Sequence, residues 1–228
     1  MDEQTHSPFN ALPPVVVALA VVLGGIELLF QLASAGLIGG QEGVGWRIGA
    51  MQSYAVLDTV WEWMRANQSF PREHLVRFVT YPFLHGGLTH AAFVVVFILA
   101  IGKMVAEVFS TLAVLLIFWL SAVVGGLAFV VLTDTPYPLI GGYPAVYGLI
   151  GAFSFIRWVN LGAMGENQMR AFGLIGMLLA IQLLFAAIYG NYGDVVADLS
   201  GFATGFLMSF LVSPGGGHRL LNRLRQRD

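Results

Sequence analysis

The stretch that decides the fold is Gly141-Gly142-Tyr143-Pro144-Ala145-Val146-Tyr147-Gly148-Leu149-Ile150-Gly151-Ala152. It opens an apolar segment, Pro144 to Trp158. This segment is shorter than the roughly 20 residues that a helix needs to cross a hydrocarbon core about 30 Å thick. We therefore expect the helix to begin inside a bundle of other helices. The preceding backbone, Leu139 to Pro144, then borders a cavity or is buried in protein, because the bilayer core tolerates non-helical backbone nowhere else.

The whole chain has the composition of a membrane protein. Hydrophobic residues make up 57% of its 228 residues and charged residues only 11%, too few to solvate an ordinary globular surface. Six segments come near the length of a membrane span: Pro14 to Leu37, Ala91 to Phe109, Thr111 to Leu132, Pro144 to Trp158, Ala171 to Tyr189 and Val195 to Val212. The sequence therefore predicts an all-α, polytopic protein with a six-helix membrane domain in residues 14–212. With no cysteine and a net charge of −2, we expect no disulfide and no nucleic-acid partner. We also expect no cofactor.

Basic residues predict which side of the membrane each end of the chain faces. They gather in the C-terminal tail and beside the loop after the fourth span: Arg157, Arg170, Arg219, Arg223, Arg225 and Arg227. By the positive-inside rule, we expect residues 1–13 and 213–228 to be cytoplasmic tails. The first loop carries arginines that oppose this assignment: Arg47, Arg65, Arg72 and Arg77. The compact size and the absence of a transit peptide favour a bacterial inner (plasma) membrane.

The first loop, about residues 39–85, is long enough to form structure of its own. Apolar residues recur in it at helical spacing: Val56, Leu57, Val60, Trp61 and Met64. An amphipathic helix of this kind lies in the membrane interface, where tryptophan is also at home. Trp61 is therefore a candidate for contact with another membrane protein, and packing of the loop over the bundle is the alternative.

A carboxylate inside a membrane span is costly unless it is paired, so Glu27 in the first span is a candidate site. Gln31 follows it by four residues and shares the same helical face. Two interpretations stay open. Either this pair contacts another helix of the same chain or snorkels to the interface, or it contacts a client or another subunit.

The stretch quoted first resembles the G-x-S-G-A-x-x-G-L-x-G-A segment of the rhomboid intramembrane serine proteases. Tyr143 stands where that family has its serine, and Pro144 stands where it has the next glycine. Residues 77–90 are similar to the family's R-x-x-T-x-x-F-x-H-x-x-x-x-H pattern, and residues 197–205 to its A-H-x-x-G-x-x-x-G pattern. The resemblance covers roughly Trp46 to Val212. It implies a six-helix rhomboid-like bundle with a partly interfacial first loop.

The resemblance also implies a site whose catalytic residues are replaced. His90 matches a histidine of the family's oxyanion hole, but Val94 stands in place of the asparagine that completes the hole. Asp198 stands in place of the catalytic histidine. Hydrolysis needs a nucleophile, a base beside it and preorganised donors for the oxyanion, and all three are missing. The resemblance thus implies an inactive member, in which we expect a hydrogen bond from Tyr143 to Asp198 to latch two helices together.

Other residues favour an inactive rhomboid-like bundle over a relocated serine nucleophile or a metal site. Gly201 and Gly205 form a small-x-x-x-small face that lets the last helix approach the fourth closely. Three serines have no histidine at a suitable spacing for a relocated nucleophile: Ser121, Ser154 and Ser200. A metal site from His85, His90 and Asp198 is not expected, because histidines five residues apart do not share a helical face.

Three functions are considered, the first of them implied by the resemblance. Inactive members of the family bind transmembrane segments of client membrane proteins without cleaving them, and we expect this function here. The first alternative is an accessory subunit of a larger membrane complex. The second is a non-standard intramembrane serine endopeptidase. The expected partners are the lipid bilayer and transmembrane segments of other membrane proteins.

Overall fold

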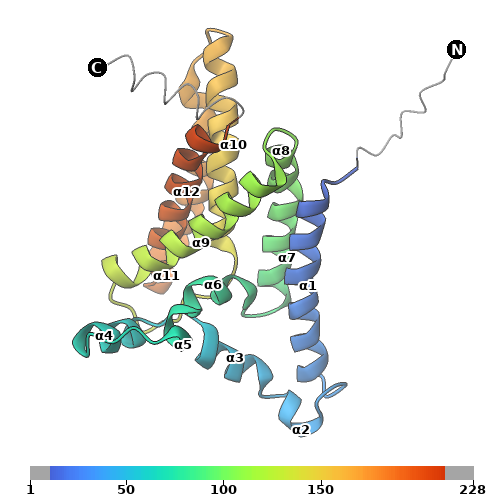
Figure 1. The fold of residues 1–228 in the computed structure, drawn as a ribbon, viewed down its shortest axis with the longest axis vertical. Helices are drawn as coiled ribbons and strands as arrows, with labels where there is room; N and C mark the ends of the chain where they lie inside the picture. Colours follow the sequence, from blue (N-terminus) through green and yellow to red (C-terminus); the bar gives the residue numbers. More distant parts are fainter. Residues whose placement is uncertain (1–10, 214–228) are drawn as a thin grey trace, which may run out of the picture.

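The computed structural model describes residues 11–213, which form a helical bundle with one loop region folded against its end (Figure 1). Six helices in these residues are long and apolar enough to cross a membrane. They are Pro14–Ser34, Leu88–Ala106, Thr111–Leu132, Tyr143–Ala163, Gln168–Tyr189 and Gly193–Val212. The predicted all-α fold with six membrane spans is confirmed. Most of both predicted cytoplasmic tails lies outside the described residues.

The elements carry the labels of Figure 1. The first span is α1 (Pro14–Ser34). The first loop contains α2 (Gly40–Gly43), α3 (Trp46–Tyr54), α4 (Asp58–Ala66), α5 (Arg72–Leu75), α6 (Arg77–Thr80) and a 3-10 turn, η1 (Tyr81–Phe83). The second span consists of α7 (Leu88–Phe97), a π-helical turn, η2 (Ile98–Gly102), and α8 (Lys103–Ala106). The remaining elements are α9 (Thr111–Leu132), α10 (Tyr143–Ala163), the 3-10 turn η3 (Gln168–Phe172), α11 (Gly173–Tyr189) and α12 (Gly193–Val212).

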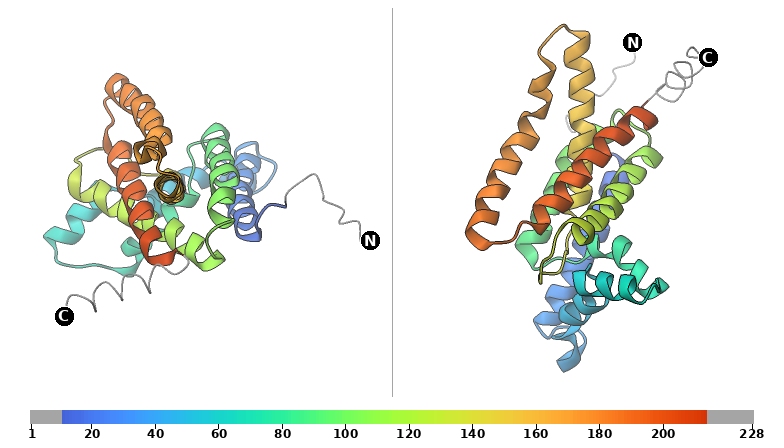
Figure 2. Two further views of the ribbon diagram at one scale, coloured as in Figure 1. Left: turned by 90° about the horizontal axis from the view of Figure 1, so that it is seen from above. Right: turned by 90° about the vertical axis from the view of Figure 1, so that its left-hand side faces the viewer.

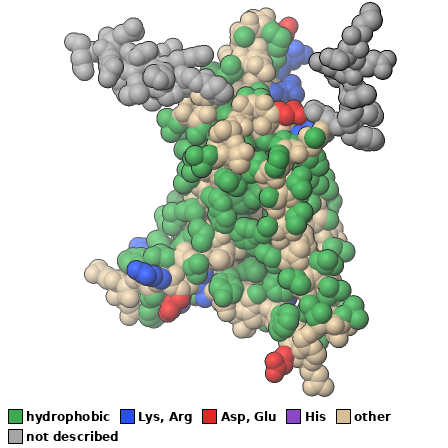
Figure 3. Space-filling view, turned by 45° about the vertical axis from the view of Figure 1, so that its right-hand side comes forward, with side chains coloured by type: hydrophobic (Ala, Val, Ile, Leu, Met, Phe, Trp, Pro, Cys, Tyr) green, Lys and Arg blue, Asp and Glu red, His purple; other side chains and the backbone are tan. Residues whose placement is uncertain are grey.

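The arrangement of the spans suits a bilayer. The beginning of α1 and the end of α12 lie at one end of the bundle, and the loop helices α2 to α6 lie at the other (Figure 1). Figure 3 shows hydrophobic side chains over the middle of one face, with charged side chains towards its two ends. Both described ends of the chain therefore lie on the same side of the bundle, as an even number of spans requires.

The central helix is α10, which the other helices surround when the bundle is seen from above (Figure 2). Eleven of its 21 residues are buried, more than in any other described helix. It meets α12 through glycines, since a Cβ atom on Gly201 or Gly205 would overlap the carbonyl oxygen of Pro144 or Gly148, respectively. This close contact fixes the start of α10 beside the start of α12.

Several predicted span boundaries were wrong; the second span, for example, runs from Leu88 to Ala106 and not from Ala91 to Phe109. The fourth span runs from Tyr143 to Ala163 and is not short. Its mean hydropathy of 1.2 is the lowest of the six, because polar residues such as Arg157 and Asn160 lie near its end. Both of these side chains are exposed and remain within the helix. The first span ends at Ser34 and not at Leu37.

The first loop docks against the bundle and holds the backbone that leads into α10. Val56 and Leu139 exchange backbone hydrogen bonds of 3.2 and 2.9 Å in an isolated antiparallel bridge. The buried Tyr81 hydroxyl donates to the carbonyl oxygen of Ala122 at 2.7 Å, and its own carbonyl accepts from the Gly141 amide at 3.0 Å. These bonds position the residues before α10, where the predicted cavity wall lies.

The predicted amphipathic helix of the loop forms as α4, from Asp58 to Ala66. Met64 is buried on its inner face, whereas Trp63 is exposed. Trp61 is partly buried and contacts Phe78 edge-on, with the ring centroids 6.2 Å apart. The structure thus places Trp61 in the packing of the loop against the bundle, which is the second of the two alternatives for this residue.

Candidate functional site

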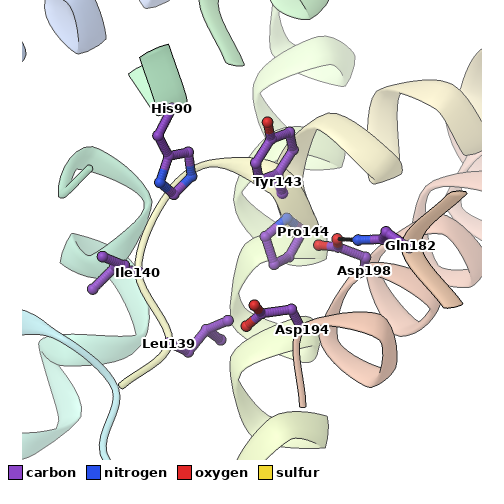
Figure 4. A pocket seen from close by; sticks show the side chains of 8 residues that line it. All are labelled: His90, Leu139, Ile140, Tyr143, Pro144, Gln182, Asp194 and Asp198. Carbon is purple, nitrogen blue, oxygen red and sulfur yellow. Dashed lines mark hydrogen bonds between the residues drawn. The ribbon is translucent and has the colours of Figure 1, made fainter. Parts of the chain in front are cut away.

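The candidate site is a cavity of about 150 Å³ among four helices (Figure 4). Its lining comes from the start of α7, the backbone before α10, the start of α10, the middle of α11 and the start of α12. The residues are His90, Leu139, Ile140, Tyr143, Pro144, Gln182, Asp194 and Asp198. Three residues singled out from the sequence, His90, Tyr143 and Asp198, therefore meet at one cavity.

The rings of Tyr143 and His90 stack on each other, with centroids 5.1 Å apart and an interplanar angle of 15°. The Gly86 amide donates to Nδ1 of His90 at 3.4 Å, which holds the imidazole in place. Gly141 lies beneath the same imidazole with φ at +92°, and a Cβ atom there would overlap Nε2. Only glycine combines this backbone conformation with so close an approach. The tyrosine ring thus covers one face of the His90 imidazole.

Val94 lies at the position of the missing asparagine and is fully buried. A Cβ atom on Gly142 would come within 2.8 Å of its Cγ1 methyl group. A methyl group cannot donate a hydrogen bond, so Val94 supplies no donor for an oxyanion beside the cavity.

The predicted hydrogen bond between Tyr143 and Asp198 was wrong. Figure 4 shows the tyrosine hydroxyl pointing away from Asp198. The donor to Oδ2 of Asp198 is the side-chain amide of Gln182, on α11. The tyrosine points away because its ring stacks on His90. The latch therefore joins α11 to α12 instead of α10 to α12.

Among the described residues, neither a relocated serine nucleophile nor a metal site is assembled at the cavity. Ser121 and Ser154 are fully buried in the bundle, and neither lines the cavity. Ser200 does not line it either. Among residues 11–213, no group of three histidine, aspartate or glutamate side chains is close enough to hold a metal ion.

Glu27 pairs with Arg47 of the first loop of the same chain, and Gln31 donates a hydrogen bond to Glu27. Oε1 of Glu27 accepts from Arg47 and Gln31 at 2.8 and 2.7 Å, and Oε2 accepts from Arg47 at 2.8 Å. Glu27 is only 1% exposed, so it offers no surface to a client or another subunit. Of the two interpretations left open for Glu27, the structure supports the contact with another helix of the same chain, because α3 brings Arg47 to it.

The same arginine extends this network to the entrance of the second span. Its Nη1 also donates to the backbone carbonyl of His85, and the imidazole of His85 meets that of His90 edge-on at 5.1 Å. The pKa of His85 is lowered to about 4, mainly because burial removes the imidazolium from water; His90 lowers it further, and Glu27 opposes both. His85 is therefore neutral at physiological pH.

This lowered pKa makes the stability of the protein depend on pH. His85 takes up a proton near pH 6.5 in the unfolded chain but only near pH 4 in the folded protein. Its contribution is complete above pH 6.5 and is lost as the pH falls towards 4, up to about 3 kcal/mol. Denaturant unfolding at pH 7 and pH 4.5 should show a smaller acid-induced loss for His85→Gln than for the unmodified protein. His74→Gln is the control and should keep the full loss; an equal loss in all three proteins would contradict the assignment.

Three interactions were missed in the sequence: those of Gln182 and Asp194 in the cavity, and that of Arg47 with Glu27. Gln182 is a polar residue in the middle of an otherwise apolar span, and this signal could have marked it. Asp194 precedes Asp198 by one helical turn, so it lies on the same face of α12. The partner of Arg47 is 20 residues away in sequence, and no local pattern indicates it.

The central glycine-packed helix and the cavity at its start define a class of protein: a six-helix membrane bundle with a site among its helices. The Rhomboid domain family matches residues 72–215, which is more than half of the chain. The chain belongs to the rhomboid family.

Two relatives carry protease names. The "Putative rhomboid protease YdcA" of Bacillus subtilis (strain 168) is 28% identical over 135 residues, or 59% of this chain and 66% of that protein. The "Rhomboid-like protease 3" of Toxoplasma gondii is 30% identical over 138 residues, or 60% of this chain and 51% of that protein. The chain thus covers less than two thirds of the length of either relative.

Proposed function

We propose that this protein is a rhomboid pseudoprotease that binds transmembrane segments of client membrane proteins without cleaving them. The observation that carries the proposal is the replacement of the nucleophile, the base and the oxyanion donor by Tyr143, Asp198 and Val94. The first two line one cavity, and Val94 packs beside it. The changes therefore fall together at the place where the family does its chemistry.

The geometry around Tyr143 supports the absence of hydrolysis. A serine hydroxyl lies one bond from Cβ, whereas the tyrosine hydroxyl lies at the far end of a rigid ring. That ring is stacked on His90, and its hydroxyl points away from Asp198 (Figure 4). Proton transfer needs the nucleophile and its base within hydrogen-bond reach. These two side chains do not meet that requirement.

The loose packing of α11 beside the cavity suits the binding of a transmembrane helix. The fifth span packs loosely, since Ile175 and Ala186 are the buried residues of α11. Figure 2 shows α11 standing apart from the bundle over much of its length. The cavity lies between α7 on one side and α11 and α12 on the other. Movement of α11 would open a lateral path from the bilayer to the cavity, and the bond from Gln182 to Asp198 is the contact that such movement breaks.

We expect no labelling of the protein by a fluorophosphonate serine probe in native membranes. An active rhomboid protease treated in parallel is the positive control. Labelling that disappears on replacement of one particular serine would show a relocated nucleophile, and the protein would then be a non-standard intramembrane serine endopeptidase.

Client binding is measured by photo-crosslinking from the exposed side of α11. Phe185 is 53% exposed and borders a second cavity, and benzoylphenylalanine can replace it with a similar ring. We expect crosslinks to several single-span proteins at substoichiometric yield. The matched control is benzoylphenylalanine at Val21, which is 65% exposed on α1. One dominant partner at fixed stoichiometry would instead indicate an accessory subunit of a larger complex.

The proposal includes a bacterial inner membrane with both tails in the cytoplasm. Two arginines that opposed this orientation are engaged in the fold: Arg47 pairs with Glu27, and the buried Arg77 donates to the Ala55 carbonyl at 2.9 Å. The native chain has no cysteine, so a single cysteine at Gln68 reports the side of the first loop. It should react with an impermeant thiol reagent added outside, and protection from that reagent would reverse the orientation.

A further inference from the structure

The cavity contains buried hydrogen-bond acceptors that no described group satisfies. Asp198 is 1% exposed, and its Oδ1 atom has no hydrogen-bond partner among residues 11–213. Oε1 of Gln182 is buried and equally without a partner. Both side chains line the same cavity, together with the carboxylate of Asp194. An unsatisfied buried acceptor is costly, so this arrangement favours a ligand that brings several donors.

The charges around the cavity point to the kind of ligand. Two carboxylates line it, and no lysine or arginine is among its eight lining residues. The beginning of α12 places its positive dipole end beside Asp194, which offsets part of one charge. The helix dipole supplies no hydrogen-bond donor to Oδ1 of Asp198. The backbone of Asp198 lies about 7.5 Å further along the helix axis than that of Gly193. A cation with N–H donors satisfies both the charge and the open acceptors.

The size and depth of the cavity fit the end of a basic side chain. Its volume of about 150 Å³ equals that of about five liquid waters, enough for an ammonium or guanidinium group and part of its stem. Asp194 is exposed, so the cavity opens at that end, and Asp198 closes the other. Lysine and arginine in a transmembrane segment extend their stems along apolar surface and place the charged group near the interface. Asp198 lies within two turns of the start of its helix.

The hydrogen bond from Gln182 to Asp198 can be exchanged for one from a ligand. It joins a neutral amide to a carboxylate. A cationic donor forms a stronger hydrogen bond to the same carboxylate than a neutral amide does. When α11 moves, a basic group can therefore replace Gln182 at Asp198, and the exchange favours the liganded state.

We propose that Asp198 and Asp194 form a binding site for an ammonium or guanidinium group, supplied by a basic residue of the client's transmembrane segment. The source of the group rests on the proposed function, whereas the site itself does not. A free organic amine has the same chemistry, and the experiment separates the two sources.

The first arm tests the site alone. The full chain in nanodiscs of zwitterionic lipid is titrated with n-butylammonium and, separately, with the neutral n-butanol, and binding is followed by saturation-transfer NMR. We expect saturable binding of n-butylammonium only, and its loss in Asp198→Asn, which keeps the shape and can still accept from Gln182. Asp134→Asn, in an exposed loop outside the cavity, is the matched control and should bind normally. Equal signals for both ligands, or unchanged binding by Asp198→Asn, would overturn the site.

The second arm tests the source. Two leucine-rich peptides of about 20 residues differ only in a lysine or norleucine near one end, and each is added to the nanodiscs. We expect the lysine peptide to bind at least about tenfold more tightly than the norleucine peptide, and the difference to vanish in Asp198→Asn. Equal binding of both peptides would uphold the proposed function and overturn a basic residue of the client as the source of the cation. Binding of n-butylammonium without binding of either peptide would uphold the site and overturn the client as its source.

Discussion

Gly205→Val is expected to lower the free energy of unfolding by about 3 kcal/mol or more. A side chain at this position would meet the carbonyl oxygen of Gly148, which is backbone and cannot rotate away. The two central helices, α10 and α12, would have to separate to admit it. Their separation would also disturb the cavity, because both helices begin there.

The measurement is unfolding of the purified protein in mixed micelles by increasing sodium dodecyl sulfate. Gly176→Val on α11 is the matched control, because a Cβ atom there has no neighbour within 4 Å. It should unfold at the same point as the unmodified protein or at a slightly higher one, since valine favours a helix more than glycine does. Equal behaviour of the two variants would show that α10 and α12 are not in close contact.

Arg47→Met is expected to destabilise the protein by about 2 to 4 kcal/mol, slightly less than the usual loss for a fully buried ion pair. The expected loss of stability is smaller than for a fully buried pair because the arginine side chain is 15% exposed. The larger part of the loss comes from Glu27, which is 1% exposed and would keep a charge without its cationic partner. The loop would also lose its bond to the backbone of His85.

A double-mutant cycle separates the pair from the packing of its side chains. Glu27→Gln combined with Arg47→Met removes both charges, so we expect the double variant to be more stable than Arg47→Met alone. Arg65→Met is the control for loss of an exposed arginine and should have little effect. Strictly additive losses in the cycle would mean that Glu27 and Arg47 do not interact.

The spans and the helix that carries the site were predictable because their signals are local. Hydropathy marks six spans, and two glycines four residues apart indicate a close helix contact. The motifs around Tyr143 and Asp198 also placed both residues at one site, since α10 and α12 start side by side. The orientation of the Tyr143 ring could not be predicted from the sequence. That orientation depends on stacking with His90, more than 50 residues earlier in the chain.

The hydrogen-bond partners of the buried carboxylates of Asp198 and Glu27 could not be predicted from the sequence either. Gln182 and Asp198 are 16 residues apart on different helices, and the rotation of α11 about its axis decides whether they meet. Its apolar residues surround it too evenly for periodicity to fix that rotation. The same holds for Glu27, whose partner comes from a loop helix with a weak pattern. A buried polar residue can be recognised in a span, but its partner requires the tertiary structure.

The stack of Tyr143 on His90 has a consequence for the history of the chain. A working active site keeps groups short of partners and gives up stability for reactivity. Here an aromatic pair, worth about 0.5 to 1.5 kcal/mol, fills that place and stabilises the fold. A change of the tyrosine to serine would lose this contact. A step back to the family's serine at this position thus begins with a loss of stability.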